Sequence, residues 1–111
     1  MPTSMIWISY DLGVSGDYEG LYSWLDSRKA KECGDSLAVI SYTFKKDLLA
    51  ELKAEISKNL KISKRTRIYV IHTDHATKKS KGKFIFGGRR VAPWSGYATS
   101  ESDIADEEVV D

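Results

Sequence analysis

The amino-acid sequence predicts an α+β fold in which a β-α-β-α-β core is followed by a β-hairpin. Three segments rich in β-branched and aromatic residues, which are typical of strands, recur within residues 1–73. The two segments between them repeat apolar residues every three or four positions, as amphipathic helices do. The chain has 111 residues, which is room for one hydrophobic core, so we expect one domain over residues 1–97.

The first half of the core contains two expected strands and one expected helix. Residues 5–12 (MIWISYDL) are expected to form a central strand. Asp17 is the expected cap of the first helix, because its carboxylate can accept hydrogen bonds from free backbone N–H groups. Gly20 weakens this helix, and Gly34 is a natural stop for it. Residues 36–44 (SLAVISYTF) are rich in β-forming types and predict the second strand.

The second half of the core contains the clearest helix of the chain. Asp47 is its expected cap, and its apolar face carries Leu48, Leu52, Ile56 and Leu60. Residues 67–73 (RIYVIHT) are the third expected strand. Consecutive β-α-β units make right-handed crossovers, so both helices are expected on one face of one sheet, as in the ferredoxin-like fold.

The second face of this predicted sheet has no helix to cover it. Such a face must be polar or covered by another molecule, which favours a homodimer formed through it. The alternative fold is a small doubly wound parallel sheet. It is disfavoured because three strands with two helices barely build one.

A β-hairpin is predicted beyond the core. Residues 83–86 (KFIF) are its first expected strand, Gly87 and Gly88 its two-residue turn, and residues 89–91 its second strand. After the hairpin the chain becomes small, polar and acidic, which predicts a disordered tail over residues 98–111.

Cysteine content and hydropathy indicate the cellular compartment in which we expect the protein. The lone Cys33 rules out an internal disulfide, which fits a reducing compartment. No segment approaches the roughly 20 apolar residues that cross a bilayer, and residues 1–4 lack the features of a signal peptide. We therefore expect a cytoplasmic protein with no membrane partner.

Charge is strongly segregated along the chain although the net charge is only +1. The net charge is −3 over residues 1–44, +10 over residues 45–90 and −6 over residues 91–111. A basic centre attracts polyanions, so this pattern favours RNA or DNA as a partner.

Residues 6–12 followed by residues 16–18 resemble the opening of SinR-type and VapD-type small proteins, and of the small nuclease subunit of CRISPR adaptation. Those proteins are ferredoxin-like homodimers, and several are metal-dependent nucleases or toxins. The resemblance implies that Asp11 is a catalytic residue and a metal ligand near a dimer axis. Residues 93–97 resemble the Trp-x-Gly-aromatic segment that closes SinR-type chains, whereas residues 74–92 depart from that pattern. The whole chain is most similar to a bacterial or phage family of its own.

Asp11 has a chemical interpretation of its own. An Asp at the carboxyl end of a strand is well placed to hold Mg²⁺, which prefers oxygen ligands, and two copies across a dimer axis would share the ion. The alternative interpretation is that Asp11 only begins a turn with Gly13.

A basic cluster is the second candidate site, and it carries the nucleic-acid prediction. Lysine and arginine neutralise phosphates, and aromatic rings stack on exposed bases. Phe84 and Phe86 are interleaved with the basic residues, and the alternative is a solvated face with both rings in the core. The candidate nucleic-acid-binding residues are Lys78, Lys79, Lys81, Lys83, Arg89 and Arg90.

Two further motifs have weaker chemistry. Residues 72–75 (HTDH) place two histidines beside Asp74, and such residues act as general bases or metal ligands. No second motif in the sequence supplies the further residues that a catalytic or metal site needs. We therefore expect these residues to form only a turn at the end of a strand. Trp94 and Tyr97 are candidate partner-binding residues, although we expect them to pack back on the sheet. The glycines lack the spacing of a phosphate loop, and no serine has a nucleophile elbow.

The leading functional hypothesis is a nucleic-acid-associated homodimer whose candidate activity is Mg²⁺-dependent phosphodiester cleavage centred on paired Asp11 residues. The alternative hypothesis is a non-catalytic module that binds a bacterial protein, such as a phage or plasmid inhibitor of a defence system. A third is a structural oligomerisation module.

Overall fold

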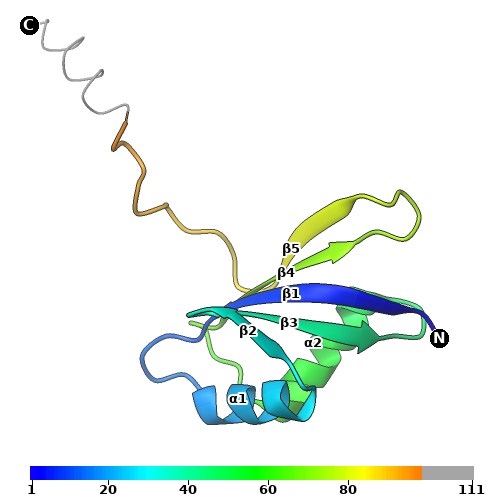
Figure 1. The fold of residues 1–111 in the computed structure, drawn as a ribbon. Coiled ribbons are helices and arrows are strands. Elements are labelled where there is room, and N and C mark those ends of the chain that lie inside the picture. The colour runs from blue at the N-terminus through cyan, green and yellow to red at the C-terminus, as the bar shows by residue number, and fades with distance from the viewer. Residues whose placement is uncertain (99–111) are drawn as a thin grey trace, which may run out of the picture.

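Five strands form one sheet with two helices on one of its faces (Figure 1). The computed structural model describes residues 1–98. The helices are α1 (Tyr18–Ser27) and α2 (Leu48–Asn59). The strands are β1 (Thr3–Asp11), β2 (Lys31–Gly34), β3 (Leu37–Thr43), β4 (Arg67–Thr73) and β5 (Ser80–Phe86).

The strand order is β2-β3-β1-β4-β5, and every neighbouring pair is antiparallel. β2 and β1 therefore run in the same direction with β3 between them, and α1 makes the crossover. In the same way α2 connects β3 to β4 across β1. This α+β arrangement is compatible with the ferredoxin-like βαββαβ order with one added edge strand. The antiparallel pairing excludes the doubly wound parallel sheet.

β1 lies at the centre of the sheet between β3 and β4, and it alternates exposed and buried residues because only one of its faces is covered by the helices. Ile6 and Ile8 are fully buried beneath the helices, and Trp7 points to the opposite face beside Val39 and Ile71. We call the face that carries Trp7 the open face, because neither helix covers it. The core lies between the sheet and the helices, and its fully buried side chains include Ile6, Ile8, Leu12, Leu21, Leu52, Ile56, Ile68 and Val70.

Both predicted helix caps are confirmed. The Asp17 carboxylate accepts from the Gly20 N–H at 2.9 Å, and the Asp47 carboxylate accepts from the Ala50 N–H at 3.1 Å. Asp17 also accepts from the Lys61 N–H at 2.9 Å, which ties the start of α1 to the end of α2. A side chain at Gly20 would clash with the helix cap, since an added Cβ would lie 2.4 Å from the Asp17 carboxylate.

The sequence prediction missed β2. This strand is the four-residue segment KECG, paired on one side only, and its first three residues are exposed. A short polar edge strand has neither the β-branched content nor the alternation by which strands are recognised. α1 consequently ends at Ser27 rather than near Gly34, which is part of β2.

The predicted hairpin between residues 83–86 and 89–91 is wrong. β5 spans seven residues and pairs with β4, so the hairpin turn is formed by residues 74–79. The Asp74 N–H donates to the Lys79 carbonyl at 2.8 Å, and the Asp74 carboxylate accepts from the Ala76 N–H at 2.9 Å. β5 ends at Phe86, Gly87 follows with a positive φ, and residues 87–98 form no strand.

Two further predictions concern the termini and membranes. The predicted acidic tail falls on residues that lie outside the described part of the chain, apart from Ala98. Among residues 1–98, neither helix has the length and apolar character that crossing a membrane requires.

Candidate nucleic-acid interface

The four lysines of the predicted basic cluster lie away from its aromatic residue Phe84. Lys78 and Lys79 are part of the turn between β4 and β5. Lys81 and Lys83 stand in register with β4 residues that face the helices, whereas Phe84 is paired with Tyr69 on the open face. Strand alternation therefore separates Phe84 from the lysines beside it in the sequence.

Arg89 and Arg90 lie at the other end of β5, and a glycine turn brings them back over the sheet. Gly87 has φ +73°, and an added Cβ would lie 2.6 Å from the Thr66 carbonyl oxygen. Only glycine fits this close approach without strain. The turn places Arg89 over the open face, where the aromatic side chains of two strands lie.

Arg67, Tyr69, Phe84 and Arg89 form what we call the arginine–aromatic cluster. The ring centroids of Tyr69 and Phe84 are 4.8 Å apart with an interplanar angle of 65°, an edge-to-face contact. The Arg89 guanidinium lies 5.7 Å from the Tyr69 centroid and 5.5 Å from that of Phe84. Arg67 lies 5.8 Å from the Phe84 centroid. These distances are those of cation–π contacts.

Three adjoining hollows meet at this cluster, and all three are lined by Arg67 and Arg89. Their volumes are about 260, 640 and 600 Å³. The side chains that line them include five cationic residues and one acidic residue, Asp11. The cationic residues are Lys64, Arg65, Arg67, Arg89 and Arg90. The region is therefore strongly positive and partly aromatic.

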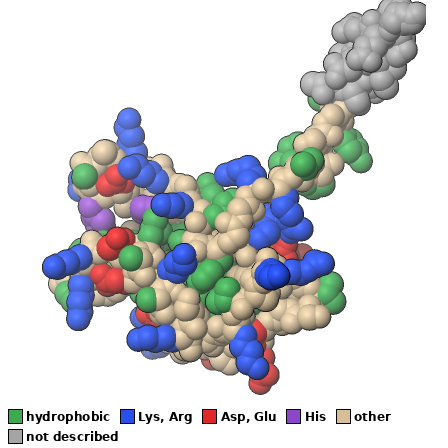
Figure 2. Space-filling view, turned by 180° about the vertical axis from the view of Figure 1, so that it is seen from behind, with side chains coloured by type: hydrophobic (Ala, Val, Ile, Leu, Met, Phe, Trp, Pro, Cys, Tyr) green, Lys and Arg blue, Asp and Glu red, His purple; other side chains and the backbone are tan. Residues whose placement is uncertain are grey.

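Lysine and arginine side chains gather around the point where the described C-terminal segment leaves the body of the molecule, with apolar side chains exposed among them (Figure 2). Because Arg67 Nε is buried and has no hydrogen-bond partner among residues 1–98, one polar group of the cluster has no protein acceptor. The surface is suited to an anionic ligand with flat apolar parts.

Asp11 lies inside this positive region. One of its carboxylate oxygens accepts from the Arg90 Nη2 at 2.9 Å, and the other accepts from the Gly13 N–H at 3.1 Å. Asp11 also stands opposite Arg67 in the β1–β4 ladder. The turn with Gly13 matches the simpler interpretation of this residue.

The residues around Asp11 within one chain do not fit a Mg²⁺ site. No group of three or more His, Cys, Asp or Glu residues is gathered anywhere in residues 1–98. The charged residues that line the hollows with Asp11 are instead all cationic, which disfavours a divalent ion.

Trp94 and Tyr97 do not pack back on the sheet. Trp94 is 73% exposed and Tyr97 is 78% exposed. The Tyr97 N–H donates to the Trp94 carbonyl at 3.0 Å, so both belong to one turn. Trp94 also lines a hollow of the arginine–aromatic cluster, together with Arg89 and Arg90. The structure thus adds one predicted partner-binding residue to the positive region.

Sequence reasoning missed Arg67 and Tyr69 of the cluster and Trp7 of the neighbouring open face. All three occupy odd-numbered positions on β1 or β4 and face away from the helices. The alternation of the two strands was a signal that could have identified them. Near them Met5 is 52% exposed and Ile71 38% exposed, so the open face continues as an apolar strip beyond the cluster.

Comparison with protein-family models, curated proteins and solved structures finds no match to this chain. The resemblance to SinR-type, VapD-type and CRISPR-adaptation proteins stays a prediction.

Proposed function

We propose that this chain binds single-stranded RNA or DNA on the open face of a ferredoxin-like sheet, through the arginine–aromatic cluster. The observation that carries the proposal is the pair of rings 4.8 Å apart with two guanidinium groups within cation–π distance. Guanidinium groups bind phosphates with two parallel hydrogen bonds, and aromatic rings stack on bases of any sequence.

Unpaired bases suit this cluster better than a duplex does. Tyr69 and Phe84 are half-buried and line a hollow of about 260 Å³, so a ligand must insert a flat group to reach them. Bases in a duplex are already stacked on one another and expose only their edges. In the free protein Arg89 covers both rings. A stacked base takes the place of its guanidinium, which then meets a phosphate.

Fluorescence anisotropy with labelled oligo(U), oligo(dT) and a matched duplex tests the proposal. We expect both single strands to bind more tightly than the duplex. Phe84→Leu keeps an apolar side chain but removes the ring, and it should weaken binding by about 1–3 kcal/mol, roughly 5- to 150-fold. Arg89→Gln should weaken binding and reduce the slope of log affinity against log salt by about one.

Lys58→Gln is the matched control, because Lys58 is an exposed cation in the last turn of α2 and lines none of the three hollows. Equal losses in Lys58→Gln and Arg89→Gln would indicate general attraction to a basic protein. An unchanged affinity in Phe84→Leu would contradict stacking.

Homodimerisation or capture of a protein partner is the second candidate function. The apolar strip of the open face favours it, because Met5, Trp7 and Ile71 are all at least 37% exposed. We expect sedimentation equilibrium to detect a dimer that Ile71→Lys dissociates. A monomer at all concentrations would reject the homodimer and leave the nucleic-acid proposal standing.

A further inference from the structure

A fourth hollow lies at the other end of β4, on the side of the sheet that carries the helices. Its volume is about 500 Å³, within the range of about 300–1,000 Å³ that is typical of small-molecule sites. Phe44, Leu48 and Leu49 provide apolar walls, and Phe44 and Leu48 are almost fully buried. No residue that lines this hollow also lines the hollows of the arginine–aromatic cluster.

The two acidic residues of the hollow are already engaged within the protein. The Asp47 carboxylate caps α2 through the Ala50 N–H. The Asp74 carboxylate pairs with the Lys81 Nζ at 2.6 Å and also accepts from a backbone N–H. The hydrogen bond from Lys81 lowers the pKa of Asp74 to about 2, so the pair stays ionised.

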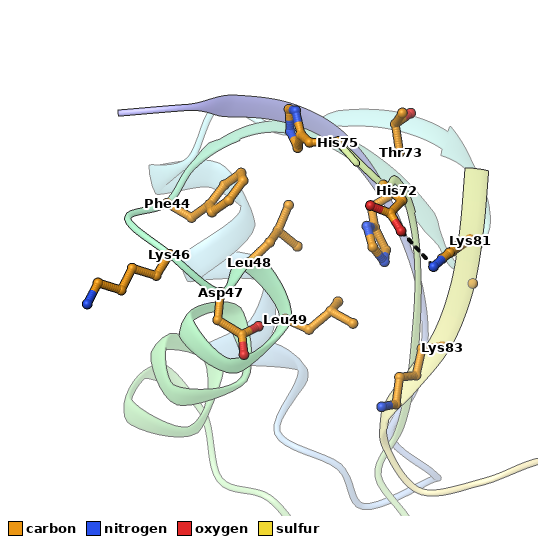
Figure 3. A pocket seen from close by; sticks show the side chains of 12 residues that line it. Phe44, Lys46, Asp47, Leu48, Leu49, His72, Thr73, His75, Lys81 and Lys83 are labelled. Atoms are coloured by element: carbon orange, nitrogen blue, oxygen red, sulfur yellow. Dashed lines mark ion pairs between the residues drawn. The ribbon is translucent and has the colours of Figure 1, made fainter. Parts of the chain in front are cut away.

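The other polar side chains of the hollow, Lys46, His72, Thr73, His75 and Lys83, have no such engagement among residues 1–98, although the His75 ring lies with its centroid 5.7 Å from that of Phe44. His72 is half-buried, and neither it nor Lys83 makes a hydrogen bond or an ion pair with another residue in the described part of the chain. Leu49 extends from α2 and Lys83 from β5 into the space between these two elements, where the His72 ring also lies (Figure 3). Lys46 also lines the hollow, but its side chain is directed away from it (Figure 3).

We propose that this hollow binds a small organic anion with a flat apolar body and one carboxylate or phosphate group. The apolar body lies against Phe44, Leu48 and Leu49. The Lys83 ammonium and a ring N–H of His72 donate to the anionic group. The proposal rests on charge complementarity: Asp74 is paired with Lys81 and Asp47 is hydrogen-bonded as a helix cap, while the Lys83 ammonium and the half-buried His72 imidazole lack a partner among the described residues.

A titration followed by ¹H–¹⁵N NMR tests this site with two matched probes, 2-naphthoate and the uncharged 2-naphthalenemethanol. We expect 2-naphthoate to shift amide signals of residues 44–49 and 72–83 and to bind about tenfold more tightly than the alcohol, the effect of one charge-assisted hydrogen bond. Lys83→Gln should remove that preference and leave the affinity for the alcohol unchanged. Lys58→Gln should change neither affinity.

Leu49→Gln tests the apolar wall separately from the charged group, because it should weaken the binding of 2-naphthoate and of 2-naphthalenemethanol alike. Equal affinities of the two probes for the unmodified chain would overturn the proposal. A preference for 2-naphthoate that survives Lys83→Gln would also overturn it, as would signals that shift only at residues 67–69 and 84–90. The last outcome would assign the anion to the arginine–aromatic cluster.

Discussion

Asp11 is the residue at which the two functional hypotheses differ most. If the chain cleaves nucleic acid with a metal, the carboxylate is indispensable. If the chain only binds nucleic acid, the same carboxylate is the one acidic group among the described residues that line the three hollows, and it holds Arg90 at 2.9 Å. Both side chains are about half exposed or more, so the ion pair itself contributes little to stability.

Asp11→Asn should therefore strengthen the binding of oligo(U), by up to about fivefold, the upper limit of a surface ion pair of about 1 kcal/mol. The change removes a repulsive charge and releases Arg90 for a phosphate. Anisotropy at low salt measures the gain, and Asp35→Asn, an exposed acidic residue between β2 and β3, is the control. Weaker binding, or loss of a Mg²⁺-dependent cleavage present in the unmodified chain, would support the nuclease hypothesis instead.

The site was only partly predictable at the level of residues. Arg89, Arg90 and Phe84 follow from the basic and aromatic composition of residues 78–90. Strand alternation indicates the face on which Tyr69 lies, but its contact with Phe84 does not follow, because it depends on the register between β4 and β5, which shifts at a bulge. Gly82 belongs to the same fit: an added Cβ would lie 2.1 Å from the Tyr69 hydroxyl, so the glycine makes room for that ring.

At the level of elements, Glu55 joins both helices to the sheet. Its carboxylate accepts from the Trp24 Nε1 at 2.7 Å, the Arg28 Nε at 2.6 Å and the Tyr42 hydroxyl at 3.0 Å. Burial raises the pKa of Glu55, but the hydrogen bonds from Arg28, Trp24 and Tyr42 outweigh it and hold the pKa below its ordinary value. Burial and the bond to Glu55 raise the pKa of Tyr42 to about 12.

These hydrogen bonds to Glu55 should make the free energy of unfolding depend on pH in the acidic range. The pKa of Glu55 is lower in the folded chain than its ordinary value of 4.5, so the unfolded chain binds more protons in acid. The stabilisation is complete when the pH is above the ordinary pKa of Glu55, and it is lost as the pH falls through the lower pKa that Glu55 has in the folded chain. We expect Glu55→Gln to lower the free energy of unfolding at neutral pH by about 1–3 kcal/mol and to flatten its decline in acid.

Urea unfolding at neutral pH and below pH 4.5 measures both effects. Glu19→Gln serves as the control, because Glu19 is exposed in the first turn of α1. A Glu55→Gln chain whose stability declines in acid as steeply as that of the unmodified chain would show that other carboxylates dominate.

The elements themselves were predicted where local patterns are strong. The sequence predicts both helix caps, the central strand and the helices on one face, and the structure confirms them. It does not predict β2, which is polar and lies at an edge, or the pairing of β5 with β4. Both misses concern edge strands, and the pairing of an edge strand depends on contacts with a distant part of the chain that local sequence patterns do not specify.

At the level of the whole molecule, opposite charges lie close together along the chain. The positive region ends at Trp94, and the first acidic residue of the tail, Glu101, follows seven positions later. Residues 99–111 contain six acidic and no basic side chains and lie outside the described part of the structure. A tethered acidic segment competes with nucleic acid for a basic surface, because the tether gives it a high effective concentration.

Replacing the six acidic residues of this segment by Asn and Gln in the full-length chain should strengthen binding of oligo(U), by about tenfold at low salt. The gain should shrink as salt rises, because screening weakens the competition between tail and ligand. A chain that ends at Ala98 should show the same gain.

A chain whose tail keeps its composition in scrambled order should bind like the unmodified chain, since the competition depends on charge rather than on a fitted sequence. If the chain with the scrambled tail binds oligo(U) as tightly as the chain with the neutralised tail, the native tail makes a specific contact rather than a general electrostatic one. If the neutralised tail brings no gain in affinity, the acidic segment does not reach the arginine–aromatic cluster.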